Sequence, residues 1–165
     1  MVTIRRAAKT DQEALGRYGA ALMRQHHASD PRRFILTEHP EAGYGRFLAS
    51  EVDDPDVLVL VADRDQEIVG YLFASIEGTS WRDLRGPCGF VHDVYVDDRV
   101  RHQGIGQDLM RAGIEWIRSR GMRQVVLWTK TKNDAAQRLF AGLGFRPTMV
   151  EMTLDLAVPD SAIMD

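Results

Sequence analysis

The sequence predicts an α+β fold, in which a mixed central β-sheet of about 6–7 strands is flanked by about four helices. Two observations support this class. Short β-rich runs and stretches with helical spacing of apolar residues follow one another in the order β-α-α-β-β-β-α-β-α-β-β. In addition, no internal repeat, low-complexity tract or long linker divides the 165 residues, so we expect a single domain over residues 1–165.

The first third of the chain predicts one strand and two helices. Val2–Ala7 is a short strand candidate. The sequence Thr10-Asp-Gln-Glu13 is a capping box, so it predicts the start of a helix with apolar residues along one side. The segment His26–Thr37 is polar and contains a proline, and we expect irregular structure there. A second helix is expected from about Glu41 to Ser50.

The middle of the chain predicts a β-hairpin, a third strand and a long helix. The β-rich runs Val57–Asp63 and Glu67–Glu77 are joined by a short polar turn, which is typical of a hairpin. After a loop, Gly89–Val96 is the next strand. Gly104 begins the helix with the clearest helical spacing in the chain, and Gly121 ends it.

The last third predicts three strands and one short helix. Arg123–Thr129 is a strand candidate. Asn133 is expected to cap a short helix that ends at Gly144. Phe145–Met149 and Glu151–Leu156 are predicted to close the chain as strands, and we expect them to pair with a second copy in a possible homodimer.

Composition excludes several classes of function. The net charge of -3 and a pI near 5.9 argue against a general nucleic-acid binder. The longest strongly apolar run, Val57–Ala62, is far too short to cross a membrane, and Met1–Arg6 has no apolar stretch of the signal-peptide kind. Cys88 is the only cysteine, which excludes an internal disulfide and a zinc site built on several thiolates. We therefore expect a cytoplasmic protein that binds neither nucleic acid nor membrane.

The segment Arg101-His-Gln-Gly-Ile-Gly106 has the features of a phosphate-binding loop. It follows a strand and opens a helix, whose unpaired N–H groups and macrodipole favour an anion. The alternative is a tight turn before a core helix. The dinucleotide fingerprint is excluded because Leu109 stands where its third glycine belongs, and the Gly-Lys-Ser/Thr end of a nucleoside-triphosphate loop does not occur.

A second motif follows this loop, Asn133-x-x-Ala136-x-x-Leu139-Phe140-x-x-Leu143-Gly144-Phe145. The two motifs in this order resemble those of the GNAT superfamily of acyl-CoA N-acyltransferases, and the resemblance covers roughly residues 57–156. It implies an N-acetyltransferase that uses acetyl-CoA, with a cofactor-binding core at about 57–156 and acceptor-side helices at about 10–50. It also implies a splay between the strands at 89–96 and 123–129. The cofactor-binding residues that it implies are Val94, Tyr95, Val96, Arg101, His102, Gln103, Gly104, Ile105, Gly106, Gln107, Asn133, Ala136 and Phe140.

The resemblance implies direct attack of an amine on the thioester in a ternary complex. Many family members carry a tyrosine that protonates the leaving thiolate, but Phe140 occupies that position here. His92 and Asp93 interrupt an apolar strand and are the candidate bases. The alternative for His92 is a buried histidine with satisfied hydrogen bonds. By resemblance, the Val94 N–H is the candidate oxyanion donor.

The resemblance implies that the acceptor is a primary amine of a small molecule or a protein. Glu77, Trp81 and His92 are the candidate residues that bind it, since a carboxylate and an aromatic ring suit a cationic amine. We predict no metal, because the five histidines lack ligand spacing. A catalytically weak or silent acyl-CoA-binding module remains the alternative, motivated by Phe140.

Overall fold

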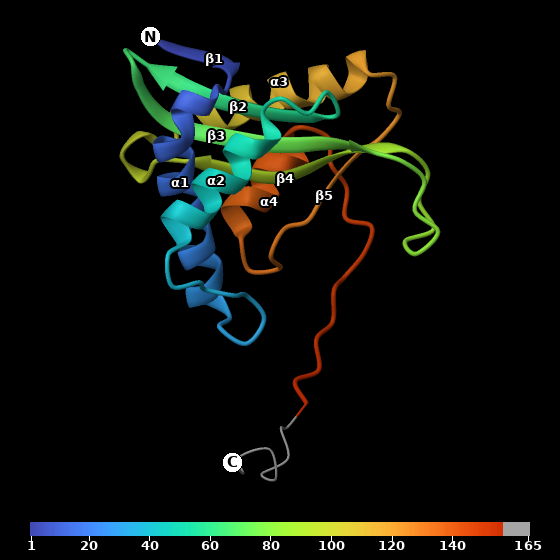
Figure 1. Ribbon diagram of the computed structural model, residues 1–165. Helices are drawn as coiled ribbons and strands as arrows, with labels where there is room; N and C mark the ends of the chain where they lie inside the picture. Colours follow the sequence, from blue (N-terminus) through green and yellow to red (C-terminus); the bar gives the residue numbers. More distant parts are fainter. Residues whose placement is uncertain (157–165) are drawn as a thin grey trace, which may run out of the picture.

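A five-stranded mixed sheet forms the centre of the molecule in a computed structural model that describes residues 1–156 (Figure 1). Its strands lie in sequence order and are antiparallel except for the last pair, β4 and β5, which is parallel. The strands are β1 Val2–Arg6, β2 Val57–Arg64, β3 Glu67–Glu77, β4 Cys88–Val96 and β5 Val125–Leu127. The predicted α+β class and mixed sheet are confirmed.

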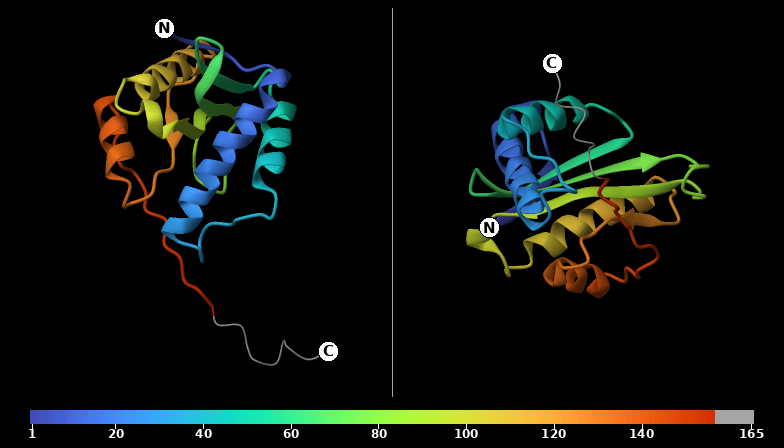
Figure 2. Two further views of the ribbon diagram at one scale, coloured as in Figure 1. Left: turned by 90° about the vertical axis from the view of Figure 1, so that its left-hand side faces the viewer. Right: turned by 90° about the horizontal axis from the view of Figure 1, so that it is seen from below.

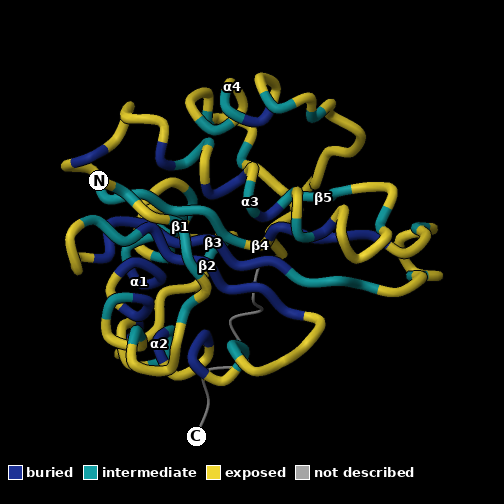
Figure 3. The backbone as a smooth tube through the Cα atoms, turned by 90° about the horizontal axis from the view of Figure 1, so that it is seen from above, coloured by how far each residue is buried: buried dark blue, intermediate teal, exposed yellow. Residues whose placement is uncertain are grey.

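Helices cover both faces of this sheet (Figure 2). The helices are α1 Gln12–Ser29, α2 Pro40–Glu51, α3 Ile105–Ser119 and α4 Asp134–Gly142. The first two pack on one face and the last two on the other. Because both faces are covered, the middle strands are apolar almost throughout instead of alternating, and β2 is buried from Val57 to Ala62. Figure 3 shows this buried centre surrounded by the exposed outer turns of the helices.

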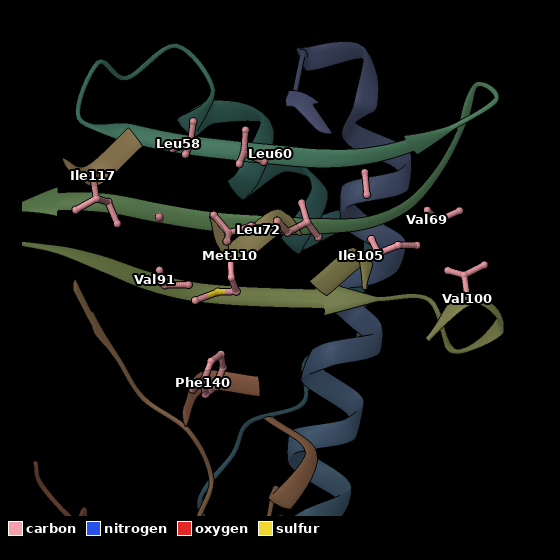
Figure 4. Packing of buried hydrophobic residues seen from close by; sticks show 13 residues of the cluster. Leu58, Leu60, Val69, Leu72, Val91, Val100, Ile105, Met110, Ile117 and Phe140 are labelled. Carbon is pink, nitrogen blue, oxygen red and sulfur yellow. The ribbon is translucent and has the colours of Figure 1, made fainter. Parts of the chain in front are cut away.

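Two hydrophobic clusters hold the layers together. The larger lies between the sheet and helices α3 and α4, where Leu72, Leu109 and Met110 are fully buried (Figure 4). The smaller lies between the sheet and helices α1 and α2, around Leu15 and Tyr71. Burial of these side chains supplies most of the free energy that fixes the sheet against the helices.

The end of the chain differs from the prediction. No strand forms in residues 145–156, so the described sheet has five strands instead of six or seven. This segment leaves the body of the molecule (Figure 1), and its exposed ion pairs join Glu151 to Arg33 and Asp155 to Arg32. Apart from Phe145, which is partly buried against the larger cluster, the large apolar residues of the segment are exposed.

Three boundaries also differ. The capping box at Thr10 does not form: a 3-10 turn precedes α1, and the Asp11 carboxylate accepts from the Ala8 N–H at 2.8 Å. Helix α1 continues to Ser29, into the segment expected to be irregular. Strand β5 is limited to three residues of the predicted 123–129. The predicted stops are confirmed at Gly121 and Gly144, both left-handed with φ of 78° and 93°.

Candidate active site between the splayed strands and the first two helices

Strands β4 and β5 pair only at their starts. Gly89, Phe90 and Val91 pair with the three residues of β5, and the rest of β4 pairs with β3 alone within the described residues. Figure 1 shows the two strands diverging beyond this point. The splay expected between 89–96 and 123–129 is therefore present, and one edge of β4 from His92 to Val96 is open.

The backbone of Val94 and Val96 faces this gap. In an antiparallel ladder only alternate residues direct their N–H and C=O groups at the partner strand. The Asp97 N–H donates to the Val69 carbonyl at 2.9 Å, so the backbone groups of Asp97 and of every second residue before it point at β3. The N–H and C=O groups of Val94 and Val96 therefore point away from β3. The Val96 carbonyl accepts a 3.1 Å hydrogen bond from Arg101 Nε at the end of the open edge.

A left-handed turn leads from this edge into α3. His102 and Gly104 have φ of 63° and 83°, and the first helical hydrogen bond runs from the Asp108 N–H to the Gly104 carbonyl at 3.0 Å. The N–H groups of residues 105–107 precede that bond and have no acceptor within the helix. Gly106 lies between Val96 and Leu139, where an added Cβ would touch both at 3.6 and 3.7 Å. The turn therefore places free N–H groups beside the gap.

Helix α4 closes the other side of the gap. Asn133 Oδ1 accepts from the Ala136 N–H at 3.1 Å, so the expected helix cap is confirmed. Phe140 is 7% exposed and packs in the larger cluster, with its ring centroid 5.9 Å from that of Phe145. An aromatic ring without a hydroxyl fills this position, and the side chain there has no proton to give.

A β-bulge decides which side chains of β4 face α1 and α2. Phe73 pairs with Asp93 and Ala74 with Val91, so His92 is an extra residue in the ladder. Val91 and Val94 both pack toward α3, which a regular two-residue period does not allow. The bulge thus places His92 and Asp93 together on the α1 and α2 side.

Asp93 is the centre of a partly buried polar cluster. Its Oδ2 accepts hydrogen bonds from the hydroxyls of Tyr44, at 2.7 Å, and Tyr71, at 3.0 Å. Gly19 of α1 lets the Tyr44 ring approach, because a Cβ there would lie 2.2 Å from the ring. Burial raises the pKa of Asp93, and the two tyrosine hydroxyls oppose that rise. Tyr71 was missed from sequence, although a tyrosine within an apolar strand needs a partner for its hydroxyl.

His92 is sandwiched between two aromatic rings. Its ring centroid lies 4.7 Å from those of Phe73 and Phe90, and Nε2 lies 2.7 Å from Ser75 Oγ and 3.7 Å from a Glu77 carboxylate oxygen. Burial lowers the pKa of His92, with the charges of Glu77 and Asp93 opposing. The imidazole is therefore largely neutral at pH 7, when it can accept a proton.

A cleft of about 260 Å³ opens next to Asp93. Its walls come from the end of α1, the loop between α1 and α2, α2 itself and β4, and they are formed by Leu22, Met23, His26, Phe34, Ile35, Tyr44 and Asp93. The sequence pointed to these helices and their loop. The sequence did not identify the apolar residues of the cleft wall, because no local pattern distinguishes them from apolar residues of the hydrophobic core.

None of the three predicted acceptor-side residues, Glu77, Trp81 and His92, is among the residues that line this cleft. The Glu77 carboxylate binds Arg85 at 2.6 Å, and Arg85 also reaches the buried Cys88 sulfur. Trp81 is 88% exposed in the loop between β3 and β4. Across residues 1–156, no group of three or more His, Cys, Asp or Glu side chains could hold a metal ion. In the same part of the chain no helix has the length and apolar character needed to span a membrane.

Comparison with known proteins gives a family match over most of the chain. The model of the acetyltransferase (GNAT) family matches residues 19–145. Mycothiol acetyltransferases from Thermobispora bispora and Nocardiopsis dassonvillei are 36% identical over 92 residues (56% of this chain, 31% of the relative) and 32% identical over 126 residues (72% and 37%). The chain thus spans about a third of the length of these relatives.

Solved structures share the fold at low sequence identity. A mutant of the BH1408 protein from Bacillus halodurans superposes with a TM-score of 0.81 at 23% identity, over 94% of this chain and 99% of that one. An acetyltransferase described with acetyl-CoA, from Clostridium acetobutylicum, gives 0.69 at 13% identity, over 94% and 96%. An aminoglycoside 6'-N-acetyltransferase from Acinetobacter haemolyticus gives 0.71 at 18%, over 95% and 99%. With the family match over residues 19–145, the chain belongs to the GNAT acetyltransferase family.

Proposed function

We propose that this protein transfers the acetyl group of acetyl-CoA to a primary amine by direct attack in a ternary complex. One observation carries the proposal: the open edge of β4 is followed, after a single 3-10 turn at Asp98–Val100, by the turn with free N–H groups before α3. The pantetheine arm pairs with Val94 and Val96 as an added strand would. Arg101 then releases the Val96 carbonyl and, with the N–H groups of 101–107, holds the pyrophosphate.

The remaining cofactor-side roles follow from the walls of the gap. Tyr95 links Val94 to Val96, with its own N–H and C=O directed at β3. Ala136 leaves room for the arm on α4, and Asn133 holds the start of that helix. Phe140 gives an apolar surface next to the thioester. These assignments rest on the position of each residue relative to the gap and on the family.

The chemistry needs an acceptor for a proton and a donor to the oxyanion. His92 takes a proton from the ammonium form of the acceptor, directly or through water, and Asp93 is the second candidate base. The neutral amine attacks the carbonyl carbon, and the Val94 N–H stabilises the oxyanion. The C–N bond forms and the C–S bond breaks, and the amine nitrogen loses its second proton. One of its two protons ends on the sulfur and the other in solvent.

Departure of the thiolate proceeds without an acid from α4. A thiol has a pKa of about 8.5, so its anion is a tolerable leaving group near neutral pH. If departure fails, the protein is an acyl-CoA-binding module with little or no turnover, and Phe140 is the observation that favours this second candidate.

Mycothiol and aminoglycoside acetyltransferases among the similar proteins favour a small-molecule acceptor over a protein amine. We place the protein in the cytoplasm, with no metal in the reaction. We also propose a homodimer in which residues 145–156 pair with the outer edge of β5 of a second copy. Five large apolar side chains of that segment are exposed, between 73% and 91%: Met149, Val150, Met152, Leu154 and Leu156.

The test combines binding with turnover. We expect acetyl-CoA to raise the melting temperature and an amine panel to release free thiol from it. Stabilisation without thiol release by any amine would favour the binding module. No stabilisation at millimolar acetyl-CoA would contradict both functions.

A further inference from the structure

We propose that the acceptor is a small primary amine with one positive charge and an apolar body, held with its ammonium group on Asp93. The inference rests on the proposed acetyl transfer and adds the substrate class. It comes from the residues that line the cleft beside β4, which are one half-buried carboxylate and a mainly apolar wall.

The carboxylate of Asp93 has room for a cation. Both tyrosine hydroxyls bind the same oxygen, Oδ2, and no hydrogen bond within residues 1–156 reaches Oδ1. Within this part of the chain, every buried side-chain oxygen or nitrogen has a hydrogen-bond partner. Because Oδ1 has no partner, it is not fully buried and retains an accessible surface. Asp93 lines the cleft, so an entering ligand meets its side chain.

Within residues 1–156, no lysine or arginine pairs with this carboxylate. The cleft wall contains no lysine or arginine, and no ion pair of Asp93 forms within residues 1–156. The nearby titratable groups are His92 on the same strand and His26 on α1, and burial lowers the pKa of both. A partly buried carboxylate without a counter-ion binds an ammonium group more strongly than it binds a neutral group, because the pair is shielded from much of the bulk water.

The rest of the wall selects an apolar body. Leu22, Met23, Phe34 and Ile35 form it together with the Tyr44 ring. Ile35 is 72% exposed, so a ligand that covers it gains buried apolar area. A sugar amine would bring several hydroxyls against this wall without hydrogen-bond partners, which costs free energy. A polyamine would bring a second ammonium group, and the cleft has only one carboxylate to receive it.

The first experiment measures kcat/KM by thiol release with 2-phenylethylamine, D-glucosamine and spermidine. We expect 2-phenylethylamine to exceed the other two at least tenfold. If acetyl-CoA stabilises the protein and glucosamine or spermidine is equal or better, the substrate class is wrong and the acetyltransferase function stands. Failure of both acetyl-CoA stabilisation and thiol release would overturn the function, and the substrate class with it.

The second experiment isolates the ammonium contact. Calorimetry measures binding of 2-phenylethylamine and of neutral 2-phenylethanol to the protein with CoA. Asp93→Asn should weaken the amine at least tenfold and the alcohol less than threefold, and Asp53→Asn, an exposed carboxylate, is the matched control. Equal losses for both ligands would contradict the ammonium contact.

A third variant keeps the proposal testable if Asp93→Asn does not fold. Ile35→Asp adds a second carboxylate at the exposed mouth of the cleft. It should raise kcat/KM for spermidine relative to 2-phenylethylamine at least fivefold, whereas Leu36→Asp, next to it and outside the wall, should not. An unchanged ratio for Ile35→Asp would place the acceptor elsewhere.

Discussion

The hydroxyl of Tyr44 donates a 2.7 Å hydrogen bond to Oδ2 of Asp93 and so joins helix α2 to the bulged strand β4. The two residues are 49 positions apart in sequence. The contact depends on Gly19, which lets the Tyr44 ring lie against α1, and on the bulge at His92, which turns Asp93 toward the helices. Four predictions follow from this cluster, the neighbouring histidine, the turn before α3 and the end of the chain.

Asp93→Asn is expected to stabilise the protein at pH 7. The pKa of Asp93 in the folded protein is raised above its usual value of 3.8, mainly by burial. The folded protein therefore favours the protonated carboxyl group. The contribution of this group to the free energy of unfolding is fully present below pH 3.8 and is lost as the pH rises through the folded pKa. Asparagine keeps an acceptor oxygen for Tyr44 and carries no charge, so its melting temperature should be a few degrees above wild type at pH 7.

Thermal unfolding between pH 4 and pH 8 checks this. The advantage of Asp93→Asn should shrink toward pH 4, where the wild-type carboxyl binds a proton. Asp53→Asn measures the effect of losing an exposed carboxylate. If Asp93→Asn were less stable than wild type at pH 7, the hydrogen bonds to the Asp93 carboxylate would outweigh the cost of burying its charge, which would contradict the prediction.

His92→Ala is expected to lower kcat/KM by about 10²–10⁴-fold, the usual contribution of a general base. Because burial holds the pKa of His92 below 6.5, wild-type kcat/KM should fall only when the pH drops below that value. The variant should lose this acidic limb of the pH profile. His39→Ala, at an exposed histidine before α2, is the control. An unchanged rate and profile for His92→Ala would leave Asp93 as the candidate base.

Gly106→Ala is expected to weaken acetyl-CoA at least tenfold without destabilising the free protein. The new Cβ meets Val96 and Leu139 at ordinary contact distances, and alanine favours the helix by up to about 1 kcal/mol. It would nevertheless stand between the pyrophosphate and the N–H groups of the turn. Gly142→Ala, in the open on α4, is a matched change that should leave binding intact. Differential scanning fluorimetry with and without acetyl-CoA measures both properties.

The pair of changes Met152→Asp and Leu154→Asp is expected to convert a dimer into a monomer. Both side chains are exposed in the single chain, so charges there cost the monomer little, whereas in an added strand at β5 they would oppose pairing. Light scattering after size exclusion measures the mass. Glu151→Gln alters the same segment at its ion pair with Arg33 and should leave the mass unchanged. A wild-type monomer at micromolar concentration would contradict the dimer.

The sequence by itself determined the local features of this protein. Gly104 starts α3 and Gly121 ends it, Asn133 caps α4, and β2 and β3 form the expected hairpin. Each of these depends on residues within a few positions of one another: a backbone angle that favours glycine, a side-chain oxygen near a free N–H, or an apolar run next to a turn. The family resemblance depended on the same kind of local spacing, and for that reason it could be read from the chain.

Only the tertiary structure decided how distant segments meet. The bulge at His92 appears when β4 pairs with β3, and it puts Asp93 within reach of Tyr71 and Tyr44, 22 and 49 residues away. Residues 151–156 look like a strand in sequence, yet they form none here, because a strand needs a neighbouring strand to pair with and this segment leaves the sheet without pairing to β5. Long-range pairing and burial are properties of the packed fold, whereas turns and caps are properties of short segments.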